Sequence, residues 1–182
     1  VLKTMDGKAQ PTFSLATFSL AASSSRNLVL GLLLLSLILR WALIFKGGQE
    51  YFPDEQRYQI SREVAESLRN GEFKVALTTL FTVPDHLGFK ILGTLPALLE
   101  WSPGTSQLLP AMFFSVFSVL NIFLIYLISI RSGASVMEAV FALTLATLNT
   151  TLFYYSRHVL PYDVSMFLGL CSLHVGLSKD AK

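Results

Sequence analysis

Long apolar runs alternate with shorter polar segments along most of this chain. A helix needs about 20 consecutive apolar residues, within a range of about 17–25, to cross the hydrocarbon core of a bilayer. Four runs approach or meet this length and predict transmembrane helices over residues 28–45, 112–130, 136–153 and 159–177. The pattern therefore predicts an all-α integral membrane protein with about four transmembrane helices.

The long segment between the first and second runs, residues 47–111, has a different pattern. Asp54 can cap a helix that stops at Asn70-Gly71, because an aspartate accepts hydrogen bonds from first-turn amides and glycine readily ends a helix. The apolar stripe of this helix consists of Tyr58, Val64, Ala65 and Leu68, and charged residues occupy the other faces. We expect an amphipathic helix at the membrane surface, within a charged and partly helical loop.

A second apolar patch in this loop extends from Leu87 to Trp101. It contains Lys90, Gly93, Pro96 and Glu100. These residues favour a segment that lies in the membrane interface, or dips into a groove, over one that spans the bilayer. A fifth crossing is the alternative, and it would change the topology of the remaining chain.

The third apolar run, residues 136–153, is of marginal hydrophobicity. Glu138 lies near its start, and Asn149, Thr150 and Thr151 lie near its end. Polar groups at membrane depth need hydrogen-bond partners. We therefore expect these side chains to face protein or water.

The composition is consistent with lipid as the surrounding solvent. Of 182 residues, 52% are hydrophobic and only 14% are charged, which is too apolar for an ordinary soluble domain. The formal net charge of +2 comes from short clusters outside the apolar runs, which argues against nucleic acid as a partner. The one cysteine, Cys171, lies within an apolar run, so neither a disulfide framework nor a cysteine-based metal site is predicted.

The basic residues predict an orientation. If all four runs cross the bilayer, both termini lie on one side, together with Arg26, Arg131 and Lys179. The positive-inside rule makes that side cytoplasmic. Residues 1–27 then form a cytoplasmic N-terminal segment, residues 28–182 form the transmembrane module, and the long loop is extracytoplasmic.

Two adjacent carboxylates, Asp54 and Glu55, follow the first run in the segment Phe52-Pro53-Asp54-Glu55. Such a pair can act as a general base or hold a cation, because one carboxylate charge raises the proton affinity of the other. The alternative is structural, with Asp54 as an N-cap and Glu55 as a first-turn acid. On spacing alone the structural interpretation is favoured.

A third carboxylate, Asp163, lies about one turn inside the fourth run, at the end of the segment from Ser156 to Asp163. The topology puts it on the same side of the membrane as Asp54. An ionisable residue within a span is costly and indicates function by default. A structural pairing with Arg157 or His158 is the alternative.

Three other polar positions carry weaker signals. Pro84-Asp85-His86 could position a substrate or turn the chain, and the turn is favoured. Arg40 could contact an anion near the membrane surface, although snorkelling of its charge to the headgroups is favoured. His174 is expected to pack as a hydrogen-bonded core residue.

The order of these parts resembles the start of the membrane glycosyltransferases of the C-type superfold, nearest to the protein O-mannosyltransferase and aminoarabinose transferase group. The resemblance covers residues 28–177 and rests on these motifs: Asp54-Glu55 after an N-terminal span, Leu68-Arg69-Asn70-Gly71 at the end of an amphipathic helix, Pro84-Asp85-His86, and the segment from Ser156 to Asp163. Two features depart from the family. His86 is followed by Leu87-Gly88 instead of the usual proline, and the chain ends where the family continues through many more helices. Both an N-terminal fragment and a shortened relative fit these departures.

The resemblance implies transfer of a sugar from a polyprenyl-phosphate donor to an extracytoplasmic acceptor, in a bacterial inner membrane or the endoplasmic reticulum. It makes Asp54 the catalytic base for the acceptor hydroxyl, supported by Glu55 and Asp163. The residues expected to contact donor or acceptor are Arg57, His86, Arg157 and His158. A divalent cation is implied only in relatives that use one, and the metal ligands stay open.

A non-catalytic transmembrane subunit of a larger complex is the alternative function. Such a subunit would keep this module and pack against other transmembrane subunits through Glu138, Asn149 and the small residues Gly133, Ala134, Gly169 and Gly176. The short chain favours the subunit. The arrangement of the three carboxylates favours the transferase.

Overall fold

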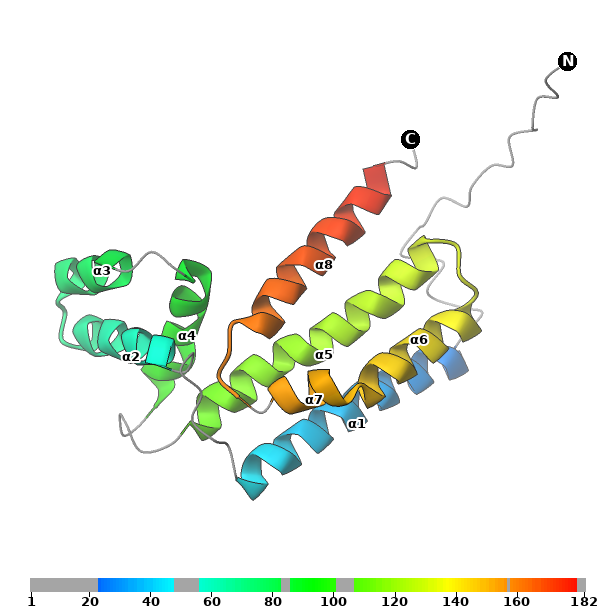
Figure 1. Cartoon of the computed structure of the whole chain (residues 1–182), viewed down its shortest axis with the longest axis horizontal. Helices are drawn as coiled ribbons and strands as arrows, with labels where there is room; N and C mark the ends of the chain where they lie inside the picture. Colours follow the sequence, from blue (N-terminus) through cyan, green and yellow to red (C-terminus); the bar gives the residue numbers. More distant parts are fainter. Residues whose placement is uncertain (1–22, 48–55, 83–85, 101–106, 157, 180–182) are drawn as a thin grey trace, which may run out of the picture.

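The computed structural model describes residues 23–47, 56–82, 86–100, 107–156 and 158–179. Its regular elements within these ranges are all helices: α1 (Ser23–Lys46), α2 (Gln56–Arg69), α3 (Phe73–Thr82), α4 (Leu87–Leu99), α5 (Leu108–Arg131), α6 (Val136–Leu148), α7 (Thr150–Tyr155) and α8 (Tyr162–Lys179) (Figure 1). The predicted all-α class is confirmed.

The helices α1 and α5 lie side by side and run in opposite directions (Figure 1). Near the end of α1, the Trp41 indole donates a hydrogen bond to Ser115 in the first half of α5, at 3.1 Å. Near the start of α1, Val29 packs in one buried cluster with Tyr126 in the second half of α5. These two contacts fix the antiparallel register.

The helix α8 runs in the same direction as α5. The Asn121 amide of α5 donates to the Asp163 carbonyl at 2.9 Å, and farther along both helices Arg131 donates to the His174 carbonyl at 2.6 Å. Between them, α6 and α7 return along the bundle after a turn at Gly133, which has a positive φ of 92°. The chain thus makes four alternating passes, in the order α1, α5, α6–α7 and α8.

Two of these helices have the length and composition of membrane-spanning helices, Ser25–Lys46 of α1 and Leu108–Arg131 of α5. The runs predicted over residues 28–45 and 112–130 lie within them. The helices α6 and α8 are apolar but shorter.

The third predicted run is two helices instead of one, and its polar residues serve helix ends. The Asn149 side chain accepts a hydrogen bond from the Leu152 amide at 3.0 Å and caps α7. Glu138 and Ser135 form a capping box at the start of α6. Their observed role is capping, because Asn and Ser side chains compete for free backbone amides. The expectation that these groups face protein or water at membrane depth stays a prediction.

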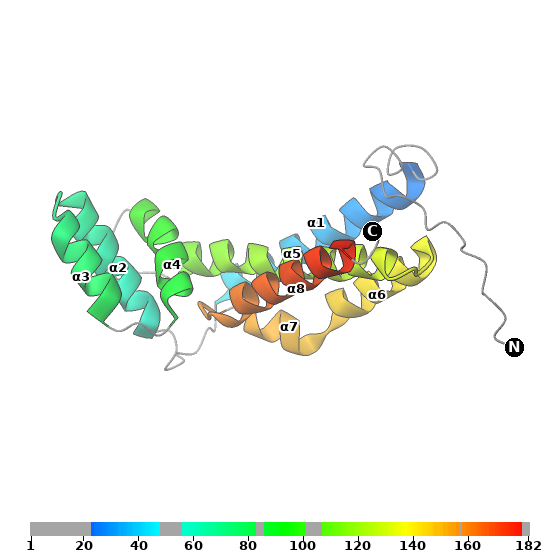
Figure 2. The same ribbon diagram turned by 90° about the horizontal axis from the view of Figure 1, so that it is seen from above.

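The helices α2, α3 and α4 form a separate group, here called the α2–α4 unit, at the end of the bundle where α5 begins (Figures 1 and 2). Phe89 of α4 packs against Phe114 of α5 with ring centroids 4.8 Å apart, which joins the unit to the bundle. Within the unit, α2 and α4 cross very closely at Gly93. A Cβ atom on Gly93 would lie 2.6 Å from Ser61 Oγ, so only glycine allows this approach.

The predicted end of α2 is confirmed, and the Asp54 cap predicted at its start lies outside the described residues. The helix ends at Arg69 and is followed by Gly71 in the left-handed region. Tyr58, Val64 and Ala65 of its apolar stripe are buried and pack inside the unit, and the expected position at the membrane surface stays a prediction. The physical reason is that α4 presents an apolar face to α2, and packing against this face removes the apolar stripe of α2 from water.

Two further differences concern α3 and α4. The sequence analysis did not identify the helix over Phe73–Thr82, whose Val75 and threonines are β-branched and weak helix formers. The patch from Leu87 is helical to Leu99, and 13 residues of helix extend only about 20 Å. That length does not support the alternative of a fifth crossing.

The close crossing at Gly93 yields a stability prediction. Gly93→Ala should lower the free energy of unfolding in detergent by about 1–3 kcal/mol, because the new methyl group overpacks against Ser61. Gly88→Ala is the matched control on the same helix, since nothing lies within 4 Å of its Cβ position. Equal midpoints of thermal unfolding for the two variants would contradict the crossing.

Candidate functional site

The most unusual residue of the bundle is Arg40, a charged side chain with 0% relative exposure on α1. Its Nε donates to Ser118 Oγ on α5 at 3.3 Å, and its Nη1 donates to the Ser36 carbonyl at 3.2 Å and to the Ser36 hydroxyl. The guanidinium also lies over the Phe153 ring, 5.0 Å from its centroid. The favoured prediction of snorkelling is wrong, because Arg40 lies on the face of α1 that packs against α5.

Among the described residues, Asp163 is the carboxylate whose charge acts on Arg40. It lies in the first turn of α8, is only 7% exposed, and interacts electrostatically with Arg40. Asn121 of α5 fixes the backbone at this point through its hydrogen bond to the Asp163 carbonyl. The structural alternative expected Arg157 or His158 as the partner of Asp163. Arg157 lies outside the described residues, so this alternative stays a prediction, and Arg40 is a further charged group that interacts electrostatically with Asp163.

Ser36, Arg40, Ser118, Asn121 and Asp163 together form a buried polar cluster, here called the Arg40 cluster, contributed by α1, α5 and α8. Within the described ranges, Arg40 Nη2 and Asn121 Oδ1 are buried atoms without a hydrogen-bond partner. One is a donor and the other an acceptor. The cluster therefore retains hydrogen-bonding capacity of both kinds among the described residues.

The other predicted site residues are placed as follows. Asp54, Glu55 and Arg157 lie outside the described residues. Arg57 lies in the first turn of α2, and its side chain is not among those described. His86 is exposed at the start of α4, where it has a positive φ of 53°.

His158 is buried beside Tyr154, with ring centroids 5.3 Å apart, in the short connection from α7 to α8. This connection also leads to Asp163, so His158 and the Arg40 cluster belong to the same end of the bundle. The α2–α4 unit that carries His86 lies at this end too (Figure 1).

The predicted site and the cluster thus overlap only at Asp163. A signal for the missed residues exists in the sequence. Ser36 and Arg40 are four residues apart in the first run, while Ser115, Ser118 and Asn121 recur every three residues in the second. Such spacings put polar groups on one face of a helix.

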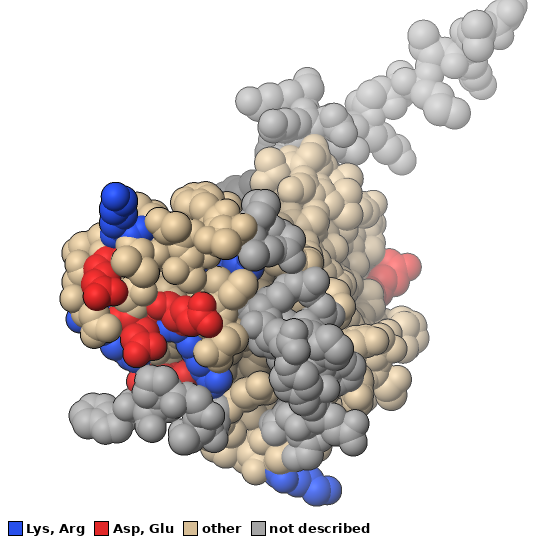
Figure 3. All heavy atoms as spheres, turned by 60° about the vertical axis from the view of Figure 1, so that its left-hand side comes forward, with Lys and Arg blue, Asp and Glu red and all other residues tan. Residues whose placement is uncertain are grey.

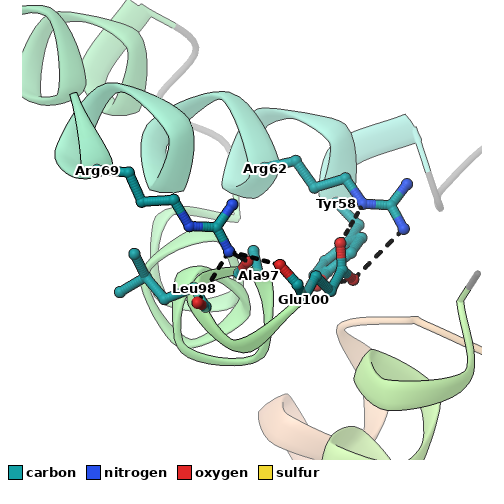
Figure 4. A network of polar contacts seen from close by, with 6 residues as sticks. All are labelled: Tyr58, Arg62, Arg69, Ala97, Leu98 and Glu100. Carbon is teal, nitrogen blue, oxygen red and sulfur yellow. Dashed lines mark hydrogen bonds and ion pairs between the residues drawn. The ribbon is translucent and has the colours of Figure 1, made fainter. Parts of the chain in front are cut away.

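A second polar network holds the α2–α4 unit together (Figure 4). Tyr58 donates to Glu100 Oε1 at 2.9 Å, and Arg62 Nε lies 2.9 Å from Glu100 Oε2 in an ion pair. Arg69 donates to the carbonyls of Ala97, Leu98 and Glu100 at 2.7–2.8 Å. Two arginines of α2 thus bind the carboxylate and the free carbonyls at the end of α4.

This network has an electrostatic consequence at Tyr58, which lies outside the long apolar helices. Burial, together with the charge and hydrogen bond of Glu100, raises the pKa of Tyr58 far above its ordinary value. Arg62 acts in the opposite direction, but its effect is smaller. The folded α2–α4 unit therefore stabilises the neutral, protonated form of the Tyr58 side chain.

Among the described residues, no group of three or more histidine, cysteine, aspartate or glutamate side chains could hold a metal ion. The adjacent carboxylates Asp54 and Glu55, which could hold a cation, lie outside these residues. Binding of the implied divalent cation stays a prediction.

The buried pair in the Arg40 cluster can be tested by a double-mutant cycle. Arg40→Met and Asp163→Asn should each destabilise the protein by about 3 kcal/mol, because each leaves a buried charged or polar partner uncompensated. The double variant should lose at least about 1 kcal/mol less than the sum of the two. Strictly additive losses in detergent unfolding would contradict an interaction between Arg40 and Asp163.

The Tyr58 network gives a pH prediction. A pKa raised in the folded state stabilises the fold fully below the unfolded value of about 10, and this stabilisation is lost as the pH rises above it. The free energy of unfolding should therefore fall more steeply above about pH 10 in the wild type than in Tyr58→Phe, by up to about 1.4 kcal/mol per pH unit. Identical alkaline profiles of the two proteins would argue against the buried neutral phenol.

Comparisons with known proteins add no family to this picture. A scan against protein-family models and searches of curated proteins and solved structures find no match for this chain.

Proposed function

We propose that this chain is a membrane glycosyltransferase, or the N-terminal part of one, that transfers a sugar from a polyprenyl-phosphate donor to an extracytoplasmic acceptor. The observation that carries the proposal is the buried Asp163, paired electrostatically with Arg40 inside an apolar bundle. Ionisable residues in such surroundings are costly and mark substrate or proton pathways by default. The donor and acceptor classes come from the sequence resemblance.

The membrane location is supported by the surface of α1. Leu28, Leu30, Leu34, Leu35 and Ile38 are each about half exposed, although they belong to the most apolar part of the chain. A core helix of a soluble protein would bury such residues. Lipid is the solvent that removes the cost of exposing them.

The proposed topology follows from the four alternating passes. Arg131 and the end of α8 belong to one end of the bundle, which the positive-inside rule makes cytoplasmic. Asp163, the end of α1 and the start of α2 belong to the other end. Asp54 and Glu55 directly precede α2 in the sequence, so chain connectivity supports placing all three carboxylates at the extracytoplasmic end.

In this mechanism, Asp54 deprotonates the acceptor hydroxyl, and Glu55 and Asp163 support it or bind the acceptor. Arg57 binds donor phosphate, because a guanidinium presents paired donors to phosphate oxygens. His86, Arg157 and His158 complete the contacts with donor and acceptor.

A non-catalytic transmembrane subunit is the second candidate, and one observation favours it. Met137 and Phe141 of α6 and Leu168 of α8 are between 57% and 73% exposed, so other helices could pack on these faces. In that case the electrostatic interaction of Arg40 and Asp163 serves only to stabilise α1 and α8 on α5. The mass of the intact protein and its partners from native membranes separates this candidate from a longer transferase.

The catalytic proposal predicts a large loss of transfer on substitution of the presumed base. Asp54→Asn in proteoliposomes should reduce sugar transfer from the lipid-linked donor by about 100-fold or more, because removal of a general base costs about 10²–10⁴ in rate. Glu66→Gln, an exposed acid on α2, is the control and should keep wild-type turnover. Wild-type transfer by Asp54→Asn would refute the role, and absence of transfer by the wild type would favour the subunit.

A further inference from the structure

The three helices of the α2–α4 unit expose different chemistry. Every exposed residue of α2 with a described side chain is polar: Gln59, Glu63, Glu66 and Arg69. The exposed large residues of α3 and α4 are apolar instead: Phe73, Val75, Leu77, Phe81, Ile91, Leu95, Leu98 and Leu99. The unit therefore has a charged side and an apolar side, and Figure 3 shows acidic and basic side chains gathered over part of it.

Among the three helices of the unit, α3 buries the fewest of its residues. Ala76 is its only buried residue, while Phe73 is 67% exposed and Phe81 is 57% exposed. Its main contacts are with α2 and α4, and it lies on the side of the unit away from the bundle (Figures 1 and 2). Water is a poor solvent for such a surface.

The exposed part of α3 consists of two adjacent stripes. Phe73, Leu77 and Phe81 follow one another at spacings of four residues, which aligns them along the helix. Lys74, Thr78 and Thr82 form the next line. The exposed part of α3 therefore combines an apolar line with a polar line beside it, as in an amphipathic helix.

The polar groups in the second stripe are suited to a lipid interface. The Thr78 hydroxyl donates to the Lys74 carbonyl at 2.9 Å, and the Thr82 hydroxyl donates to the Thr78 carbonyl at 2.7 Å. Both hydroxyls are thus satisfied within the helix, as a water-poor environment requires. Lys74, the one charged residue of α3, can extend its amine to lipid phosphates.

We propose that α3 and the exposed apolar side of α4 insert into the boundary between headgroups and acyl chains, while the charged side of α2 faces water. The proposal rests on the membrane location proposed above for the bundle. Ten residues of helix extend about 15 Å, too short to cross a bilayer but suitable for lying within its interface. The partner of this surface is therefore the lipid bilayer, not another protein.

Single fluorescent labels test this in phosphatidylcholine vesicles. On a Cys171→Ala background, a nitrobenzoxadiazole label is attached to Phe81→Cys on α3, Glu63→Cys on α2 or Leu34→Cys on α1. Lipids with a spin label near the headgroup quench a probe in the interface, and iodide quenches a probe in water. The Phe81 label should show several-fold stronger quenching by lipid than the Glu63 label, and weaker quenching by iodide.

Three other outcomes would overturn the inference in different ways. Lipid quenching at Leu34 with water-like behaviour at Phe81 would reject the insertion of α3 and leave the membrane bundle intact. Protection of the Phe81 label from both quenchers would assign the surface to a protein partner or a second copy. Iodide quenching of all three labels, including Leu34, would remove the membrane location on which the proposed function also depends.

Discussion

The bundle depends on the placement of one charge, that of Arg40, inside an apolar interior. Removing a guanidinium from water costs several kcal/mol unless hydrogen bonds and an opposite charge offset the loss. Ser36 and Ser118 provide hydrogen bonds, and Asp163 provides the opposite charge. Because these partners come from α1, α5 and α8, the cost is offset only when all three helices take their observed positions.

The α2–α4 unit depends on a different interaction, the hydrogen bonds that backbone carbonyls at the end of α4 accept from α2. Arg69 of α2 donates to the carbonyls of Ala97 and Leu98 at the end of α4 and of Glu100 directly after it. Gly93 then allows the two helices to approach closely enough for Tyr58 and Arg62 to reach Glu100. Since α2 is engaged in this way, the apolar surface left to solvent or lipid belongs to α3 and α4.

Together, the cluster and the unit occupy the same end of the bundle, which supports a single functional end. The Arg40 cluster lies where α8 begins, and Phe89 and Phe114 join the unit to the start of α5 nearby. A donor with a lipid tail and a sugar headgroup needs both an apolar approach and polar contacts. In the proposed function, the apolar surface of the unit meets the first need, and the carboxylates meet the second.

The sequence by itself determined the helical class, the presence and approximate position of α1 and α5, and the stop of α2 at Gly71, because length, apolar content and glycine conformation are local properties. It did not predict α3, the break at Asn149 or the burial of Arg40. These depend on competition among distant groups: α4 covers α2, a side-chain amide replaces a helical hydrogen bond, and Asp163 makes a buried arginine tolerable. Only the tertiary structure brings residues 40, 121 and 163 together, since their interactions connect helices far apart in the chain.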